Sequence, residues 1–267
     1  MQPEQMTVAL TGACGGIGQV LARQLAAAGA SLYLCGRDGE ALATLQRELS
    51  AKADGNQFIE AYEVDLTDDS EIDRWLASID QVERPVNVLV NNAGICKFEM
   101  FDKLTDRDIE QMMNLNSVVP MKLTRKLLPG LKQRPAARIV NIASTFAAIG
   151  FPGYSVYSAS KYAIRGFSQA LSRELSDTNV RVGCILPRAT RTAINTDRVV
   201  EMNRRLSVAM DPPEKVAAAV IRFIASERGE LALGWPEKLL VRLNSVFPTL
   251  VGKAISKKLP LIKQYAA

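Results

Sequence analysis

The chain has 267 residues, 48% hydrophobic and 23% charged, with a formal net charge of +5 and a sequence pI near 9.0. This length suits a single α/β domain with a full hydrophobic core. Histidine is absent and the four cysteines are widely spaced without a metal-binding pattern. The composition therefore argues against a zinc site or a His-based triad, and we expect no metal and reduced thiols.

Sequence features also bear on location and partners. No apolar run reaches the roughly 18 residues needed to span a bilayer, and the start of the chain has no basic region. We therefore expect a cytoplasmic protein. The basic residues carry no nucleic-acid motif, so no nucleic-acid partner is predicted. Their excess would attract an anionic cofactor, an acidic carrier or an anionic membrane.

Apolar runs and amphipathic stretches alternate along the chain. The runs predict strands at Thr7–Thr11, Ser31–Cys35, Phe58–Val64, Asn87–Asn91, Arg138–Ala143, Arg181–Leu186 and Glu230–Leu233. The amphipathic stretches predict helices at Ile17–Ala28, Asp38–Ala51, Asp69–Ser78, Asp106–Leu131, Tyr154–Ser176 and Pro213–Ala225. This alternation predicts an α/β fold, a Rossmann-type doubly wound parallel sheet of about seven strands with helices on both faces. We expect one domain over 1–234, which binds the dinucleotide and carries catalysis.

A glycine-rich turn follows the first predicted strand and opens the first helix. Its sequence, from Thr11 to Gly18, is TGACGGIG. Glycines allow a backbone to approach a pyrophosphate, and the helix N-terminus offers free N–H groups and a positive dipole end. We therefore predict a dinucleotide-binding turn. The residues expected to contact the cofactor here are Gly12, Cys14, Gly15, Gly16, Ile17 and Gly18.

A tyrosine and a lysine lie four residues apart in a segment that reads as helix. At that spacing Tyr157 and Lys161 share one helix face. The ammonium favours the phenolate and should lower the tyrosine pKa from its usual value of about 10. Tyr157 could then exchange a proton with a carbonyl or alcohol near neutral pH.

The glycine turn, the NNAG sequence at 91–94 and the Tyr157/Lys161 pair stand in an order that resembles the short-chain dehydrogenase/reductase family. The resemblance extends from about Met6 to about Leu233. It implies that Ser144 orients the substrate. It also implies that the backbone carbonyl of Asn116 holds a water that relays protons to Lys161; Asn114 imitates the motif locally. Further cofactor contacts implied are Asp65, Leu66, Asn91, Ala93, Gly94, Tyr157, Lys161, Pro187 and Thr192.

The cofactor preference depends on the residues after the second predicted strand. An acidic residue there would bind both ribose hydroxyls of NAD(H), but Gly36 takes that place and Arg37 follows it. A guanidinium can pair with a 2′-phosphate, so NADP(H) is favoured over NAD(H). Gly15 stands in the turn where NADP-binding relatives often carry a basic residue. Arg188 replaces the glycine that usually follows the proline of the sixth strand, which adds bulk and charge beside the nicotinamide pocket.

Apolar residues around these motifs indicate a lipophilic substrate. We expect the substrate to contact Ser144, Phe146, Phe151 and Tyr157, with Ile95, Phe98, Ile149, Tyr154 and the loop 193–210 as further pocket candidates. The predicted function is an NADP(H)-dependent oxidoreductase that interconverts a carbonyl and a secondary alcohol on an acyl chain, a steroid-like ring or a similar group. The alternative is a non-catalytic NADP-binding regulatory or scaffold protein of the same fold.

The last segment, 235–267, is not covered by these motifs. Apolar residues recur there at helix-like spacing with lysines between them, and Pro236, Pro248 and Pro260 divide it into short pieces. We expect an amphipathic helical extension of the same domain. It either packs on the domain or on another subunit of a homodimer or homotetramer, or rests on an anionic membrane.

Overall fold

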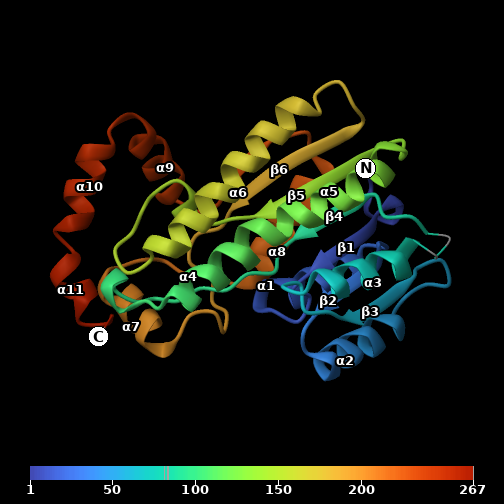
Figure 1. Ribbon diagram of the computed structural model, residues 1–267, viewed down its shortest axis with the longest axis horizontal. Coiled ribbons are helices and arrows are strands. Elements are labelled where there is room, and N and C mark those ends of the chain that lie inside the picture. Colours follow the sequence, from blue (N-terminus) through green and yellow to red (C-terminus); the bar gives the residue numbers. More distant parts are fainter. Residues whose placement is uncertain (81, 83, 267) are drawn as a thin grey trace.

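The computed structural model describes residues 1–266 except 81 and 83. Its seven strands are β1 (Thr7–Thr11), β2 (Ser31–Gly36), β3 (Ile59–Glu63), β4 (Val88–Asn91), β5 (Ala137–Ile142), β6 (Val180–Leu186) and β7 (Glu230–Ala232). They form one parallel sheet in the order β3-β2-β1-β4-β5-β6-β7 (Figure 1). The predicted doubly wound α/β fold is confirmed.

Helices pack on both faces of the sheet. They are α1 (Gly16–Ala27), α2 (Gly39–Ser50), α3 (Asp69–Asp80), α4 (Asp106–Met113), α5 (Val119–Lys132), α6 (Ser155–Glu174), α7 (Asp197–Arg205) and α8 (Pro213–Ala225). One hydrophobic cluster joins the sheet to α1, α2 and α8, and a second joins it to α3, α5 and α6. The central strands β1, β2, β4, β5 and β6 are largely buried on both sides, which explains their mostly apolar sequences, whereas the edge strands β3 and β7 are only partly buried.

The segment predicted as one helix over Asp106–Leu131 divides into three parts. A π-helical turn over Asn114–Val118 separates α4 from α5. Its buried Asn116 donates from Nδ2 to the Ile95 carbonyl and accepts at Oδ1 from the Ile95 N–H, both at 2.9 Å. Such π-turns inside helices are frequently found at functional sites.

The last segment forms three short helices, α9 (Glu237–Val246), α10 (Pro248–Ser256) and α11 (Leu259–Lys263). Each begins at or beside one of the three prolines, where a missing N–H costs no helix hydrogen bond. Figure 1 shows these helices at the left edge, near α7 and far from α2 and α3. Across residues 1–80, 82 and 84–266, no helix is long and apolar enough to cross a membrane.

Candidate active site

The glycine turn is fixed by close backbone contacts at the carboxyl end of β1. Gly12 has a φ of +65°, and a Cβ built on it would lie 2.8 Å from the Cα of Ala93. A Cβ on Gly18 would lie 2.1 Å from the Gly12 carbonyl oxygen. Thr11 Oγ1 accepts hydrogen bonds from the N–H groups of Asn92 and Ala93, at 3.0 Å each. Only glycine fits these positions, and α1 starts beside them, as a phosphate cradle requires.

The loop after β6 lies against the same turn. A Cβ on Gly16 would lie 2.4 Å from Thr192 Cγ2, so the threonine methyl packs against the start of α1. The Pro187 carbonyl accepts from the Thr145 N–H at 2.9 Å, which places Pro187 beside the end of β5. Both predicted cofactor residues of this loop therefore lie at the carboxyl edge of the sheet.

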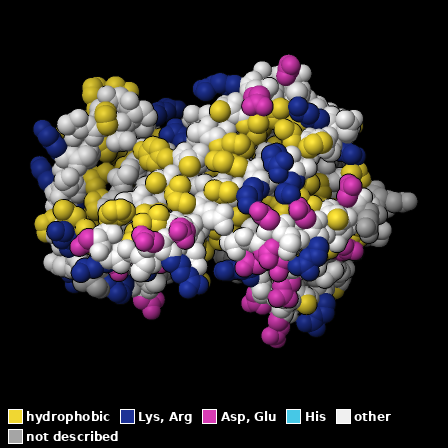
Figure 2. Space-filling model, viewed as in Figure 1, with side chains coloured by type: hydrophobic (Ala, Val, Ile, Leu, Met, Phe, Trp, Pro, Cys, Tyr) yellow, Lys and Arg dark blue, Asp and Glu magenta, His cyan; other side chains and the backbone are white. Residues whose placement is uncertain are grey.

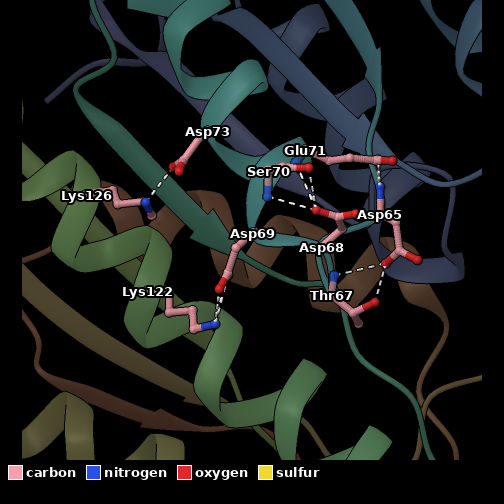
Figure 3. A network of polar contacts seen from close by, with 9 residues as sticks. All are labelled: Asp65, Thr67, Asp68, Asp69, Ser70, Glu71, Asp73, Lys122 and Lys126. Atoms are coloured by element: carbon pink, nitrogen blue, oxygen red, sulfur yellow. Dashed lines mark hydrogen bonds and ion pairs between the residues drawn. The ribbon is translucent and has the colours of Figure 1, made fainter.

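The ends of β2 and β3 bring Arg37 and Asp65 together. The Asp65 carboxylate accepts from the N–H and hydroxyl of Thr67, at 2.9 and 2.7 Å, and its own N–H donates to Glu71 (Figure 3). These hydrogen bonds, together with the nearby Arg37 charge, lower the pKa of Asp65. Arg37 is exposed and forms no ion pair with any described residue, which leaves its guanidinium available to an anion. Leu66 is buried.

Figure 3 also shows the ion pairs that hold α3 against α5. Lys122 and Lys126 of α5 pair with Asp69 and Asp73 of α3 across the gap between the two helices. Asp68 caps the start of α3 by accepting from the N–H of Ser70 at 2.8 Å. Asp69 and Asp73 of α3 are therefore engaged in ion pairs, and Asp68 caps the helix.

A cavity of about 380 Å³ opens between the glycine turn and α2. Its lining includes Cys14, Arg23, Asp38 and Glu40. Burial raises the pKa of the Cys14 thiol, with a smaller contribution from the Asp38 carboxylate. Cys14 and Ile17 both pack against the hydrophobic core, and Cys14 also borders this cavity.

Ser144, Tyr157 and Lys161 meet at the end of β5 and the start of α6. Ser144 Oγ accepts from the Phe146 N–H at 3.2 Å, so its own proton remains free to donate. Lys161 Nζ lies 5.7 Å from the centre of the Tyr157 ring and donates to the Ile142 carbonyl at 3.1 Å. The predicted catalytic side chains are thus adjacent in space.

The protonation states differ from the sequence prediction. Burial raises the pKa of Tyr157, and a hydrogen bond with Ser144 offsets this only in part. Burial also lowers the pKa of Lys161 to about 8, because the residue is only 5% exposed and desolvation disfavours its ammonium form. The net shift of the Tyr157 pKa is therefore opposite in direction to the lowering expected from Lys161, because desolvation is its largest cause.

Gly94 is the point where Asn116 and Lys161 approach each other. A Cβ on Gly94 would lie 3.0 Å from Asn116 Oδ1 and 3.4 Å from Lys161 Nζ. Asn116 Nδ2 also donates to Ser160 Oγ at 3.0 Å, which links the π-turn to α6. Asn91, the last residue of β4, donates to Asn141 Oδ1 at 2.8 Å. The side chain of Asn116 positions the backbone around Ile95, which the sequence argument did not anticipate.

Aromatic rings form a wall beside Tyr157. Phe146 stacks on Phe151 at a centroid distance of 5.4 Å and meets the Tyr157 ring edge-on at 6.3 Å. Tyr154 lies 4.9 Å from Phe98 and 6.1 Å from Tyr157. The predicted substrate-contacting residues therefore lie together around the phenol.

A cavity of about 210 Å³ adjoins this wall and includes residues that the sequence did not identify. It is lined by Cys96, Lys97, Phe98, Tyr154, Ile194, Thr196, Arg198, Val199 and Tyr265. The loop expected over 193–210 contains α7, whose start is capped by Thr196. Tyr265 comes from the end of the chain, and its carbonyl accepts from Arg198 at 2.6 Å. The capping threonine was a readable signal for α7, but nothing local indicated Tyr265.

The Arg188 side chain contacts the segment before α8 and the start of the tail. Its guanidinium binds both oxygens of Asp211, at 2.9 and 2.8 Å, and also contacts Glu237 and the Trp235 carbonyl at 3.0 Å each. These partners lie before α8 and at the start of the tail. Arg188 therefore holds the end of β6 to α9.

A profile of the short chain dehydrogenase family matches residues 6–203. The chain belongs to the short-chain dehydrogenase/reductase family, and it is an oxidoreductase of that class. Nodulation protein G of Rhizobium sp. (strain N33) is 31% identical over 230 residues, 84% of this chain and 91% of that protein. Ketoacyl reductase HetN of Nostoc sp. (strain PCC 7120) is 32% identical over 254 residues, 92% and 87% of the two chains.

Solved structures of family members share the fold. A short-chain dehydrogenase/reductase from Burkholderia phymatum in complex with NAD superposes with a TM-score of 0.82 at 23% identity, over 92% of this chain and 94% of that one. The closed form of a serine dehydrogenase complexed with NADP⁺ superposes with a TM-score of 0.75 at 29% identity, over 85% and 94%. The two neighbours hold different nicotinamide cofactors.

Proposed function

We propose that this short-chain dehydrogenase/reductase is NADP(H)-dependent and interconverts a carbonyl and a secondary alcohol on a lipophilic substrate. The observation that carries the proposal is the convergence of Ser144, Tyr157 and Lys161 beside an aromatic wall. Acid–base chemistry on a carbonyl oxygen needs a proton donor and a second hydrogen-bond donor within reach of that oxygen. Tyr157 and Ser144 supply these two groups.

Each residue has a defined role in this proposal. A bound nicotinamide would supply or accept the hydride at the substrate carbon. Tyr157 gives or takes the proton on the substrate oxygen, and Ser144 donates its free hydroxyl proton to the same oxygen. Lys161, with its pKa near 8, exchanges protons with Tyr157 around neutral pH and binds the nicotinamide ribose. Asn116 positions the Ile95 backbone and, through its own carbonyl, holds the relay water.

The residues at the ends of β1, β2 and β4 fit a dinucleotide. Gly12 and Gly18 leave no room for a side chain, and α1 begins at Gly16 with free N–H groups. NADP(H) is favoured because Gly36 offers no carboxylate to a ribose, while Arg37 is exposed and unpaired among the described residues. The NADP⁺ complex of the serine dehydrogenase supports this preference, whereas the NAD complex of the Burkholderia protein supports NAD(H).

The substrate class follows from the wall beside Tyr157. Phe98, Phe146, Phe151 and Tyr154 surround the phenol with apolar surface, and burying a small polar substrate there would leave its polar groups unsatisfied. The name of the relative HetN, a ketoacyl reductase, supports an acyl group or another apolar chain.

The test is a turnover screen over ketones and acyl thioesters with NADPH and NADH. Tyr157→Phe removes only the phenolic hydroxyl, so turnover should fall by roughly 10²–10⁴-fold while NADPH binding stays within about twofold. The matched control is Tyr162→Phe, an exposed tyrosine on the same helix, which should retain wild-type turnover. A Tyr157→Phe enzyme that keeps more than about a tenth of the activity would refute the assignment.

A further inference from the structure

The three tail helices are held to the domain by one face. Val241, Val251 and Ile262 are buried, and Asn244 Nδ2 donates to the Ala148 carbonyl at 2.8 Å. The Arg188 contacts with Glu237 and with the Trp235 carbonyl fix the start of α9. Because the inner face is anchored in this way, the outer face of the tail has a defined shape.

The outer face carries an apolar ridge. Seven of the twelve exposed large hydrophobic side chains among the described residues lie within 235–250. They are Trp235, Leu239, Leu240, Leu243, Val246, Phe247 and Leu250, with exposed fractions of 70, 42, 38, 36, 68, 55 and 68%. Figure 2 shows hydrophobic side chains at the upper left, where α9 meets α10. So many exposed apolar side chains within one short segment mark an interaction surface.

Positive charge surrounds the ridge. Residues 235–267 contain six lysines and arginines (Lys238, Arg242, Lys253, Lys257, Lys258 and Lys263) and one acid, Glu237. That difference equals the whole net charge of +5, so residues 1–234 are electrically balanced. Within the described part of the chain, Glu237 pairs with Arg188 and none of the six cations forms an ion pair. All six are exposed.

We propose that the apolar ridge and its cations form a docking surface for an anionic phospholipid bilayer. A bilayer supplies both an apolar interior for Val246, Phe247 and Leu250 and negative headgroups for the lysines. A second copy of the chain suits this surface poorly, because a twofold contact would bring the same unpaired cations together. Trp235 is a residue type that favours the headgroup level.

The same tail reaches the substrate cavity, so the proposal extends the proposed function and rests on it for this step. Ile262 is fully buried against Tyr154 and Met202, and Tyr265 lines the 210 Å³ cavity. A bilayer under α9 and α10 would therefore lie next to the segment that closes the pocket. The lipophilic substrate would then reach the cavity from the membrane side.

The experiment uses the full-length protein and sedimentation with vesicles of phosphatidylcholine alone or with about 30% phosphatidylglycerol. The wild type should sediment with the anionic vesicles, and less so as salt rises from about 50 to 500 mM. The triple variant Val246→Ser, Phe247→Ser and Leu250→Ser should lose at least about tenfold in affinity. The triple variant Lys253→Gln, Lys257→Gln and Lys258→Gln should lose about a hundredfold.

Two control variants remove similar groups elsewhere. Tyr162→Ser removes an exposed aromatic ring and Lys132→Gln an exposed cation, and neither should change sedimentation. Light scattering on the serine triple variant tests whether the ridge instead binds a second copy of the chain. A drop in its molecular mass would show that the ridge joins copies of the chain and would overturn the proposal.

Wild-type protein that stays in the supernatant, or that binds neutral vesicles equally well, would also overturn the docking surface. Sedimentation needs no substrate, so this outcome is separate from failure of the proposed enzyme activity. A protein that binds vesicles but reduces no carbonyl would retain the docking surface and lose the enzyme assignment. Truncation at 234 is the weaker test, because it would also remove buried Val241, Val251 and Ile262.

Discussion

Replacing Arg188 by methionine should strongly destabilise the fold. The side chains of Arg188 and Asp211 are 11% and 4% exposed, and the guanidinium makes four hydrogen bonds to three partners. Removing one partner of a buried pair typically costs about 3–5 kcal/mol. Lys215 still reaches Asp211 at 2.9 Å, although its own side chain is 59% exposed. We therefore expect a loss near the lower end, about 3 kcal/mol.

The assay is equilibrium urea unfolding followed by the fluorescence of Trp75, which is 2% exposed. The matched control is Arg204→Met, whose guanidinium is 72% exposed and pairs with Glu201, and which should cost less than about 1 kcal/mol. The Arg188 contact lowers the pKa of Asp211, so its stabilisation is present above the unfolded pKa of about 4 and is lost as the pH falls through the folded pKa. Equal losses in the two variants, or a pH-independent loss for Arg188→Met, would refute this reasoning.

Two further substitutions test the cofactor site. Arg37→Asp should shift the NADPH/NADH preference toward NADH by roughly 10- to 100-fold in kcat/KM, because it repels a 2′-phosphate; a wild type that already prefers NADH would contradict the interpretation of this turn. Gly12→Ala should cost about 1–3 kcal/mol of unfolding free energy, because Gly12 has a φ of +65° and no room toward Ala93. The control is Gly130→Ala in α5, where nothing lies within 4 Å of the new Cβ, and its unfolding free energy should rise by about 0.5–1 kcal/mol. Equal changes in unfolding free energy for the two alanine variants would refute the steric argument.

The central strands were predictable from sequence because they are largely buried on both faces and read as mostly apolar runs. All seven predicted strands occur, and Thr7–Thr11 has the predicted bounds. The glycine turn was predictable for a similar reason, since its geometry is local to Thr11–Gly18. The π-turn was not predictable, because the hydrogen bonds of Asn116 to Ile95 connect distant segments.

Contacts between distant segments also explain the other differences. Arg188 contacts Asp211 and Glu237 only in the folded chain, and the distances along the sequence between these residues do not predict the contacts. Tyr265, from the end of the chain, lines the 210 Å³ cavity beside the aromatic wall. The pKa of Tyr157 depends on burial, which a four-residue spacing to Lys161 does not report.

The homo-oligomer and the cytoplasmic location stay predictions.

Lys161→Met should reveal the destabilising effect of burying this ammonium. Burial lowers the pKa of Lys161 from 10.5 to about 8. At pH 7 the folded protein holds a desolvated charge, so methionine, of similar length, should raise the unfolding free energy by up to roughly 3 kcal/mol while abolishing turnover.

That gain has a definite dependence on pH. Between pH 8 and 10.5 the folded wild type has released a proton that its unfolded chain still binds, so the stability of the wild type rises relative to the variant. Tyr157 and Cys96, whose pKa values are raised by burial, oppose this rise, but both are present in the two proteins and largely cancel in the difference. Urea unfolding at pH 7 and at pH 10 measures that difference. If methionine destabilised the fold equally at both values, Lys161 would be a structural residue. A gain that shrinks as the pH rises would mean that the fold tolerates an unfavourable buried ammonium, as expected of a group retained for the proposed chemistry beside Tyr157.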